Sequence, residues 1–248
     1  MTLKKKIIIA ASAAAFILAA FIGAGAYMKH RFDAETAVMT PVPSGPLNPE
    51  IVAVRDGFVN VYLVKNGDSF IAFDAGNDCA DVAKKLSLLK LDPLKVTAVF
   101  LTHTDRDHVA ALGIFSRAKV YLSAAEKQMI DGTTSRSFGF SNHIAGDYTT
   151  FEDGETVVVG SVSVRAILSP GHTPGSACYL VNGRYLFTGD TLSLRKGKAG
   201  RFNDFFNMDS AREEESIRML ARTVSPYMIL TAHYGVTWDS ETAFGSWK

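Results

Sequence analysis

The short stretch LTHTDRDHVAAL, residues 101–112, gathers four side chains that can coordinate a metal ion: His103, Asp105, Asp107 and His108. Imidazoles and carboxylates this close together are costly to desolvate unless a cation balances the carboxylates. The stretch therefore predicts a metal centre. The alternative is a polar loop that happens to be rich in His and Asp.

Three further candidate ligands follow apolar runs that are predicted to be strands. Loops at strand ends, fixed by neighbouring Gly and Pro, are common positions for functional residues. Each of these residues alone would more often be a surface or capping residue, so it is their combined order along the chain that indicates one shared site. They are His172 in SPGHTPG, Asp190 in FTGDT and His233 in TAHYG, after the predicted strands 161–168, 184–188 and 227–231.

Two similar hairpins are predicted among the elements that must position these loops. NVYLVKNGDSFIAFDAG (60–76) contains Asn66-Gly67, and ACYLVNGRYLFTGDT (177–191) contains Asn182-Gly183. Asn-Gly between two apolar runs predicts a tight hairpin turn in which both residues reach positive φ. Because both segments end in an Asp, they suggest two similar halves, although hairpins are common enough for coincidence to be the alternative.

Helices and strands alternate through the rest of the chain. This mixture suits sheets packed face to face with helices outside. Periodicity and the N-cap residue Asp209 predict helices over 78–91, from 109 onward, over 123–130 and over 209–224, and strands over 96–102, 119–122 and 156–159.

Over nearly all of residues 51–235 the chain resembles the metallo-β-lactamase-fold hydrolases. The His-x-Asp-x-Asp-His sequence of 103–108 is similar to the family motif His-x-His-x-Asp-His, and a lone His, a lone Asp and a last His follow in the family's order. The resemblance implies an α/β (α+β) fold, a four-layer αββα sandwich of two similar halves. It also implies a centre of two divalent metal ions, zinc in the first instance, with iron or manganese as alternatives.

The resemblance further implies which residues bind which ion. Asp74 matches an acidic position that supports the ligands from behind. Residue 105 is Asp where the family most often has His; Asp can still coordinate zinc, and an added oxygen ligand shifts the preference toward iron or manganese. The alternative is that residue 105 does not coordinate, leaving the first site weak or empty. The implied ligands are His103, Asp105 and His172 for the first ion, Asp107, His108 and His233 for the second, and Asp190 bridging both.

The implied reaction is hydrolysis of an ester, thioester, lactone or related bond by a hydroxide that bridges two metal ions. Asp107 is the expected catalytic residue, orienting the hydroxide and accepting its proton. The sequence contains no Gly-x-Ser-x-Gly elbow that would indicate a serine nucleophile. Two alternatives stay open: an oxidoreductase similar to the single-iron persulfide dioxygenases, and a non-catalytic, membrane-tethered metal-binding module.

Residues that could select a small-molecule substrate follow Asp190 and His233. The basic residues could attract an anionic substrate or simply face solvent, and Tyr234 could donate a hydrogen bond to the substrate. The phenylalanines could wall an apolar pocket or pin the loops to the body. The basic residues are Arg195, Lys196, Lys198 and Arg201, and the phenylalanines are Phe138, Phe140, Phe202, Phe205 and Phe206.

The first 50 residues differ in composition from the rest. Lys4, Lys5 and Lys6 precede Ile7–Met28, which contains no charged residue and is long enough to cross a bilayer. We expect residues 1–31 to be a membrane anchor or signal segment, 32–50 a proline-rich linker, and 51–248 the folded domain. The positive-inside rule favours a single-pass protein of the cell membrane with its domain outside. The alternative is secretion after cleavage near Ala24-Gly25-Ala26.

Length, charge and cysteine content limit the classes of protein to which the chain can belong. The chain has 248 residues, 47% of them hydrophobic, and a formal net charge of +1. This length suits one α/β domain, and the charge gives no reason to expect nucleic-acid binding. The two cysteines, Cys79 and Cys178, are too few for a disulfide framework, and we expect both to be buried free thiols.

Overall fold

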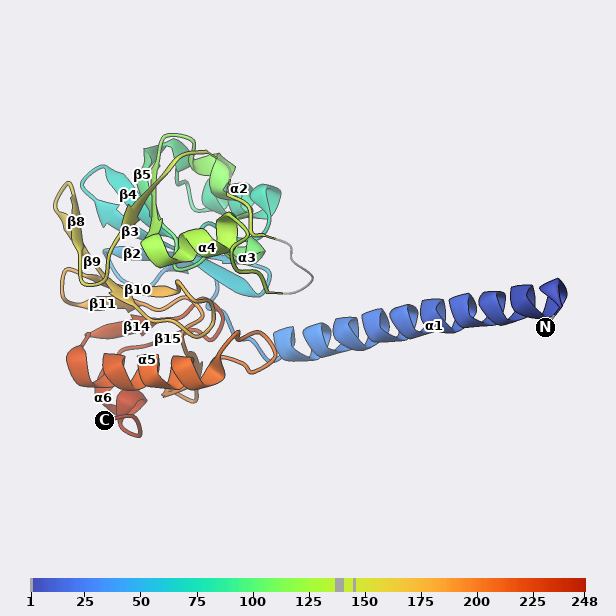
Figure 1. Cartoon of the computed structure of the whole chain (residues 1–248). Helices are drawn as coiled ribbons and strands as arrows, with labels where there is room; N and C mark the ends of the chain where they lie inside the picture. Colours follow the sequence, from blue (N-terminus) through green and yellow to red (C-terminus); the bar gives the residue numbers. More distant parts are fainter. Residues whose placement is uncertain (1, 137–140, 145) are drawn as a thin grey trace. The chain divides into compact units, whose positions relative to one another are not determined.

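The computed structural model describes residues 2–136, 141–144 and 146–248. It divides into two units, Met1–Met39 and Thr40–Lys248. The first unit contains one helix, and the second contains two large sheets, a small two-stranded sheet and several helices (Figure 1). Phe138 and Phe140 lie outside the described residues.

The helix of the first unit is α1 (Leu3–Thr36). It continues past residue 31, where we expected the anchor to end, because i,i+4 ion pairs stabilise its last turns. Lys29 Nζ lies 2.5 Å from Asp33 Oδ2, and Arg31 Nη2 lies 3.2 Å from Glu35 Oε1. The helix is long and apolar enough to cross a membrane, and a signal sequence would have the same features.

The first sheet of the second unit has seven strands in sequence order, β1 to β7. Strands β1 to β4 pair in antiparallel fashion, whereas β4 to β7 are parallel neighbours. The strands are β1 (Gly45–Pro46), β2 (Ile51–Asp56), β3 (Val59–Asn66), β4 (Ser69–Phe73), β5 (Val96–Phe100), β6 (Lys119–Ser123) and β7 (Tyr148–Phe151).

The second sheet has six strands in the order β15-β14-β11-β10-β9-β8. All neighbours are antiparallel except β11 and β14. A separate hairpin pairs β12 (Ser193–Arg195) with β13 (Lys198–Gly200). The sheet consists of β8 (Thr156–Val159), β9 (Val162–Leu168), β10 (Ala177–Val181), β11 (Tyr185–Phe187), β14 (Met228–Leu230) and β15 (Val236–Thr237).

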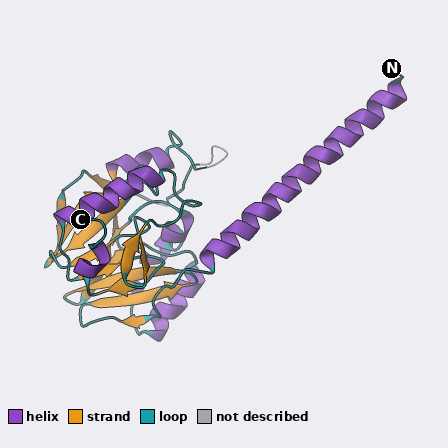
Figure 2. Cartoon of the chain, turned by 90° about the horizontal axis from the view of Figure 1, so that it is seen from below, coloured by secondary structure: helices purple, strands orange, loops and turns teal. Residues whose placement is uncertain are grey.

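Period-two alternation along the strands separates two cores. Tyr62 and Phe73 of the first sheet face Tyr179 and Phe187 of the second, and the rings of Phe73 and Phe187 stack with centroids 4.0 Å apart. The intervening residues, such as Leu63, point to the other face of the first sheet, where α2 packs. The two large sheets therefore lie face to face, and Figures 1 and 2 show helices on both sides of the strands. This confirms a mixed α/β fold with several sheets.

The helices of the second unit are short except for α5. Asp78 and Asp209 cap α2 and α5 by accepting backbone N–H bonds, and for Asp209 this confirms the predicted N-cap. The prediction of a helix from residue 109 onward is wrong. The Ala111 N–H donates a hydrogen bond to the Gly76 carbonyl, so the chain does not continue α3. The helices are α2 (Cys79–Leu88), α3 (Arg106–Val109), α4 (Lys127–Ile130), α5 (Ser210–Thr223) and α6 (Ser240–Phe244), with 3₁₀ turns at Pro93–Lys95, Leu112–Phe115 and Ala124–Glu126.

One of the two predicted hairpin turns is shifted. In the second hairpin, Asn182 and Gly183 both have positive φ, as predicted. In the first hairpin Asn66 still pairs with Ser69, so the turn residues are Gly67 and Asp68 and only the glycine has positive φ.

Part of the segment expected to be a linker is held on the second unit. The buried Asn60 exchanges two hydrogen bonds with the backbone of Val42, at 2.8 and 2.9 Å, and β1 pairs with β2. A buried side-chain amide needs such partners, which explains why the chain from residue 40 follows the sheet.

Candidate metal centre

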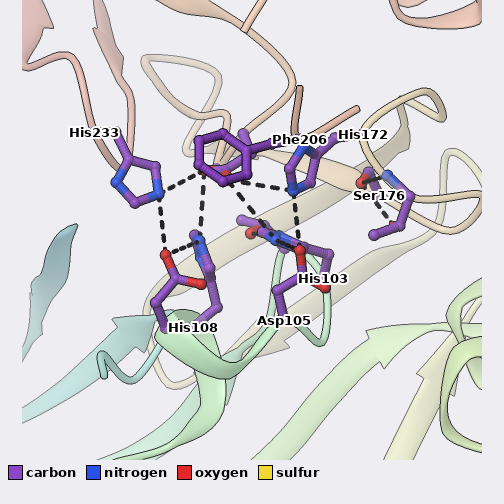
Figure 3. A network of polar contacts seen from close by, with 12 residues as sticks. His103, Asp105, His108, His172, Ser176, Phe206 and His233 are labelled. Atoms are coloured by element: carbon purple, nitrogen blue, oxygen red, sulfur yellow. Dashed lines mark hydrogen bonds and ion pairs between the residues drawn. The ribbon is translucent and has the colours of Figure 1, made fainter. Parts of the chain in front are cut away.

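All seven candidate ligands lie in loops or the short helix that follow strands. Figure 3 shows the four histidines pointing toward one another from these loops. The structure thus brings together residues that are far apart in sequence. His103 and Asp105 follow β5, Asp107 and His108 lie in α3, and His172, Asp190 and His233 follow β9, β11 and β14.

One ligand atom from each of His103, His172 and Asp190 lies within 4.8 Å of the others; we call these residues the first ligand group. Asp190 Oδ2 is 3.9 Å from His103 Nε2 and 3.3 Å from His172 Nε2. Asp105 flanks this group, with its Oδ2 at 3.4 and 3.1 Å from the same two nitrogens.

Asp107, His108 and His233 form the second ligand group, again within 4.8 Å of one another. Asp107 Oδ2 is 3.6 Å from His108 Nε2 and 3.4 Å from His233 Nε2. The other oxygen of Asp190, Oδ1, lies 3.5 and 3.1 Å from the same two nitrogens. Asp190 therefore presents one oxygen to each group.

The ligand atoms fit a metal because four of them are buried without a hydrogen-bond partner among the described residues. Buried polar atoms are normally satisfied, and groups left over at one point call for a specific explanation. A cation at each ligand group would satisfy them. The atoms are the Nε2 nitrogens of His103, His108 and His233, and Oδ1 of Asp190.

The charges at the centre also favour a cation. Burial alone raises the pKa of Asp190, but His233, His108 and His172 outweigh it and hold this pKa well below its usual range. Burial lowers the pKa of His233, yet Asp190 and Asp107 raise it to about 10. Carboxylates that draw a proton onto a buried imidazole would also draw a metal ion.

In each of the four candidate ligand histidines, Nδ1 forms a hydrogen bond with an oxygen atom, which leaves Nε2 facing the centre. Such partners fix the ring orientation and tautomer of metal-binding histidines. The partners are Thr102 Oγ1 for His103 (3.1 Å), Asp74 Oδ2 for His108 (2.9 Å), Asn207 Oδ1 for His172 (3.2 Å) and the Phe58 carbonyl for His233 (2.8 Å).

Asp74 supports two of the candidate ligands at once. Its carboxylate accepts hydrogen bonds from the Thr102 backbone N–H at 2.8 Å and the Thr102 hydroxyl at 3.0 Å, in addition to its contact with His108. Thr102 in turn contacts His103. Asp74 has φ of 60°, a conformation uncommon for a residue other than glycine, which aims its side chain beneath the centre.

Glu126 joins two ligand loops and was missed by sequence reasoning. It is fully buried, and its carboxylate accepts from the Thr104 N–H and hydroxyl, both at 2.8 Å, and from the Thr173 hydroxyl at 2.7 Å. Ser123 and Glu126 are spaced as in a capping box, so the local sequence indicates only the start of a helix and not this role. Burial raises the pKa of Glu126.

Glu213 supports His172 through Asn207 and was also missed. The Asn207 amide donates to Glu213 Oε2 at 2.8 Å, which turns the Asn207 oxygen toward His172. Glu213 is fully buried, and burial raises its pKa to about 8. In the sequence AREEES (211–216) nothing distinguishes Glu213 from its neighbouring glutamates, and a solvent-exposed side chain would be expected.

The candidate substrate residues are only partly placed near the centre. Lys196 and Lys198 are exposed, and Arg201 pairs with Asp204 at 2.7 Å and Glu214 at 3.4 Å. The Arg195 guanidinium lies 5.4 Å from the ring centroid of Tyr234. No contact of these four cations with the ligands is found in the described parts of the chain, so their role stays a prediction.

Phe202 packs against one histidine of each ligand group. Its buried ring lies 5.0 Å from the ring of His172 and 5.5 Å from that of His233, measured between centroids. It also contacts Phe206 at 6.1 Å. Apolar rings therefore cover one side of the centre.

The two cysteines are free. Cys178 is buried, as expected, but the expectation that Cys79 is buried is wrong, because it occupies the exposed first position of α2.

Comparison with known proteins identifies relatives that are named as hydrolases. The family model described as the metallo-beta-lactamase superfamily matches residues 54–233. The chain is 36% identical over 127 residues to the probable polyketide biosynthesis zinc-dependent hydrolase BaeB of Bacillus velezensis, a match that covers half of each chain. It is 27% identical to the hydroxyacylglutathione hydrolase of Salmonella arizonae, over 74% of this chain and 64% of that protein.

Solved structures show the same fold at low identity. A B3 metallo-β-lactamase with an active-site glutamic acid superimposes with a TM-score of 0.65 at 18% identity, over 84% of this chain and 87% of that one. BJP-1, a subclass B3 metallo-β-lactamase of Bradyrhizobium japonicum, gives a TM-score of 0.62 at 15% identity, over 79% of each chain.

Proposed function

The chain belongs to the metallo-β-lactamase superfamily and is a metal-dependent hydrolase, and from this premise we propose that it uses two metal ions to cleave an ester, thioester, lactone or related bond. The observation that carries the proposal is the position of Asp190, whose two oxygens face two separate groups of ligand atoms. A carboxylate placed in this way suits a pair of cations better than one. Relatives named as zinc-dependent hydrolases favour zinc.

The two ions would supply Lewis-acid chemistry, lowering the pKa of a bound water molecule and polarising the substrate's reacting oxygen. The protein's own contribution begins with Asp107. Its side chain is 23% exposed, compared with 17% for Asp105 and 5% for Asp190, so it is the carboxylate most accessible to an arriving water molecule. We assign Asp107 to orienting that water and accepting its proton.

The remaining residues hold this arrangement in place. Asp74 and Thr102 fix the rings of His108 and His103, and Phe202 keeps solvent from one side of the centre. A dry, rigid surrounding strengthens the electrostatic interactions that stabilise developing negative charge.

We further propose that α1 anchors the protein in the cell membrane with the domain on the outer side. The lysines at positions 4–6 and the uncharged stretch after them support this orientation. Removal of a signal segment near residue 26 is the alternative. Mass spectrometry of the intact protein purified from membranes separates the two, since an anchored chain keeps its first 26 residues.

The function is tested by metal analysis and a substrate panel on the same preparation. The full chain, purified in detergent and dialysed against zinc, should contain two ions per molecule and hydrolyse at least one ester, thioester, lactone, β-lactam or phosphodiester. Asp190→Ala should lose both metal and activity, whereas Asp204→Ala, which changes an exposed carboxylate paired with Arg201, should lose neither. One ion per molecule, or two ions without turnover of any class, would contradict the proposal.

A further inference from the structure

The side chain of Arg136 reaches into the first ligand group. Its Nε and Nη2 contact the two oxygens of Asp105 at 2.9 and 2.5 Å, a bidentate pairing of high strength and specificity. Nη2 also lies 2.7 Å from His172 Nε2, and Nη1 donates to the Phe206 carbonyl, which holds the guanidinium in place. Figure 3 shows the close approach of Asp105 and His172 at this point.

The contact with His172 uses the same lone pair that a metal would need. Asn207 donates its amide to Glu213, so its oxygen must accept from His172 Nδ1–H. A neutral imidazole that donates from Nδ1 has its only lone pair on Nε2. That lone pair faces an N–H of Arg136, so His172 cannot bind the guanidinium and a metal ion at the same time.

Asp105 is likewise occupied by protein donors. Its Oδ1 accepts from the Asn142 amide at 3.1 Å in addition to Arg136. The second ligand group differs because no lysine or arginine of the described chain pairs with Asp107, and neither of its histidines, His108 and His233, has a hydrogen-bond partner at Nε2 among the described residues. In the first group this holds only for His103 Nε2. The two groups are therefore unequally prepared for a metal.

We propose that Arg136 is a resident cation of the first metal site and makes the two sites fill in sequence. The second ligand group, with Asp190, binds its ion first and tightly. The first group binds an ion only when the guanidinium rotates away from Asp105 and His172, and Arg136 is 26% exposed, so it has solvent to move into. This inference rests on the proposed function, because it requires that both groups bind metal.

The sequential filling is tested by titrating the metal-free full chain, in detergent, with zinc against a competing chelator. The wild type should show two classes of site. Arg136→Ala should tighten the weaker site by about 10- to 100-fold, because the ion then no longer has to displace charge-assisted hydrogen bonds, and it should leave the tighter site unchanged. The affinity of the weaker site in Arg136→Lys should lie between those of the wild type and Arg136→Ala, because a lysine keeps the charge but cannot form the bidentate contact with Asp105.

A matched control removes Arg106, which lies in the ligand segment 103–108 and whose side chain shows no contact with the candidate ligands among the described residues. Arg106 is exposed and donates to Asn77 Oδ1 at 3.1 Å, so Arg106→Ala should change neither affinity. Titration with cobalt gives a second readout: the absorption bands of the two sites should appear one after the other in the wild type and together in Arg136→Ala.

The outcomes separate this inference from the proposed function. A wild type that binds fewer than two ions at saturating zinc contradicts the proposed function. Two equal sites in the wild type, unchanged by Arg136→Ala, contradict only the role of Arg136. Loss of the weaker site in both folded variants, Arg136→Ala and Arg136→Lys, would show that Arg136 positions Asp105 for the metal and would also overturn the inference.

Discussion

Replacing Glu126 tests whether one buried carboxylate joins the ligand loops. In Glu126→Ala the backbone N–H and the hydroxyl of Thr104 lose their acceptor, each at 2.8 Å, while the Thr173 hydroxyl can turn to Ser176 Oγ at 2.8 Å. A buried donor without a partner costs about 1–3 kcal/mol. Two such donors give about 2–6 kcal/mol, and removing a carboxylate whose burial is itself unfavourable offsets part of this.

We therefore expect Glu126→Ala to lower the free energy of unfolding by about 3 kcal/mol. Glu126→Gln keeps an oxygen for both donors of Thr104 and offers an amide to Thr173, which can then donate to Ser176. It should cost no more than about 1 kcal/mol. Urea denaturation of the metal-free protein, with chelator present, measures both changes without a contribution from bound metal.

The same variants should differ in metal affinity. Thr104 lies between His103 and Asp105, and Thr173 follows His172, so loosening both threonines should weaken zinc binding at the first ligand group by about 10- to 100-fold. Glu126→Gln should retain near-normal affinity. Equal stability losses for Ala and Gln, or a loss below about 1 kcal/mol for Ala, would refute the reasoning that hydrogen bonds to Glu126 hold the loops.

Two further predictions concern Glu213 and Gly189. Burial raises the pKa of Glu213 from 4.5 to about 8, so between these pH values the unfolded chain loses this proton while the folded chain keeps it. The free energy of unfolding should then fall by about 1.4 kcal/mol per pH unit from this group, and chemical denaturation of Glu213→Gln should lack that slope. Gly189 has φ of +52°, and a Cβ there would lie 2.3 Å from Thr102 Oγ1. Gly189→Ala should cost more than about 2 kcal/mol in the same assay and weaken metal binding, because Asp190 comes next.

Both predictions have a direct comparison. Wild type and Glu213→Gln should be equally stable near pH 5 and diverge toward pH 8, and parallel pH profiles would argue against the assignment. Gly67 also has positive φ, at +61°, but open space around it. Gly67→Ala should therefore cost only the backbone strain of about 1–2 kcal/mol, and an equal loss in Gly67→Ala and Gly189→Ala would show that contact with Thr102 is unimportant.

Local patterns in the sequence were sufficient for the main elements. The Asn182-Gly183 turn, the N-cap at Asp209 and the strand predicted over 96–102, observed as Val96–Phe100, depend on neighbouring residues alone, so they could be predicted. The shifted turn at Gly67 and the short α3 could not, because strand pairing and a hydrogen bond to Gly76 decided them.

The types, order and spacing of the candidate ligands are properties of the sequence, and they were enough to predict a metal centre because few chemistries use His and Asp in this arrangement. Their partners belong to the tertiary structure. Glu126 and Arg136 show no signal in their own surroundings, since a glutamate near a helix start and an arginine in a loop are ordinary. They acquire their roles only when folding brings Thr104, Thr173 and Asp105 within hydrogen-bond distance, from segments that no local pattern connects.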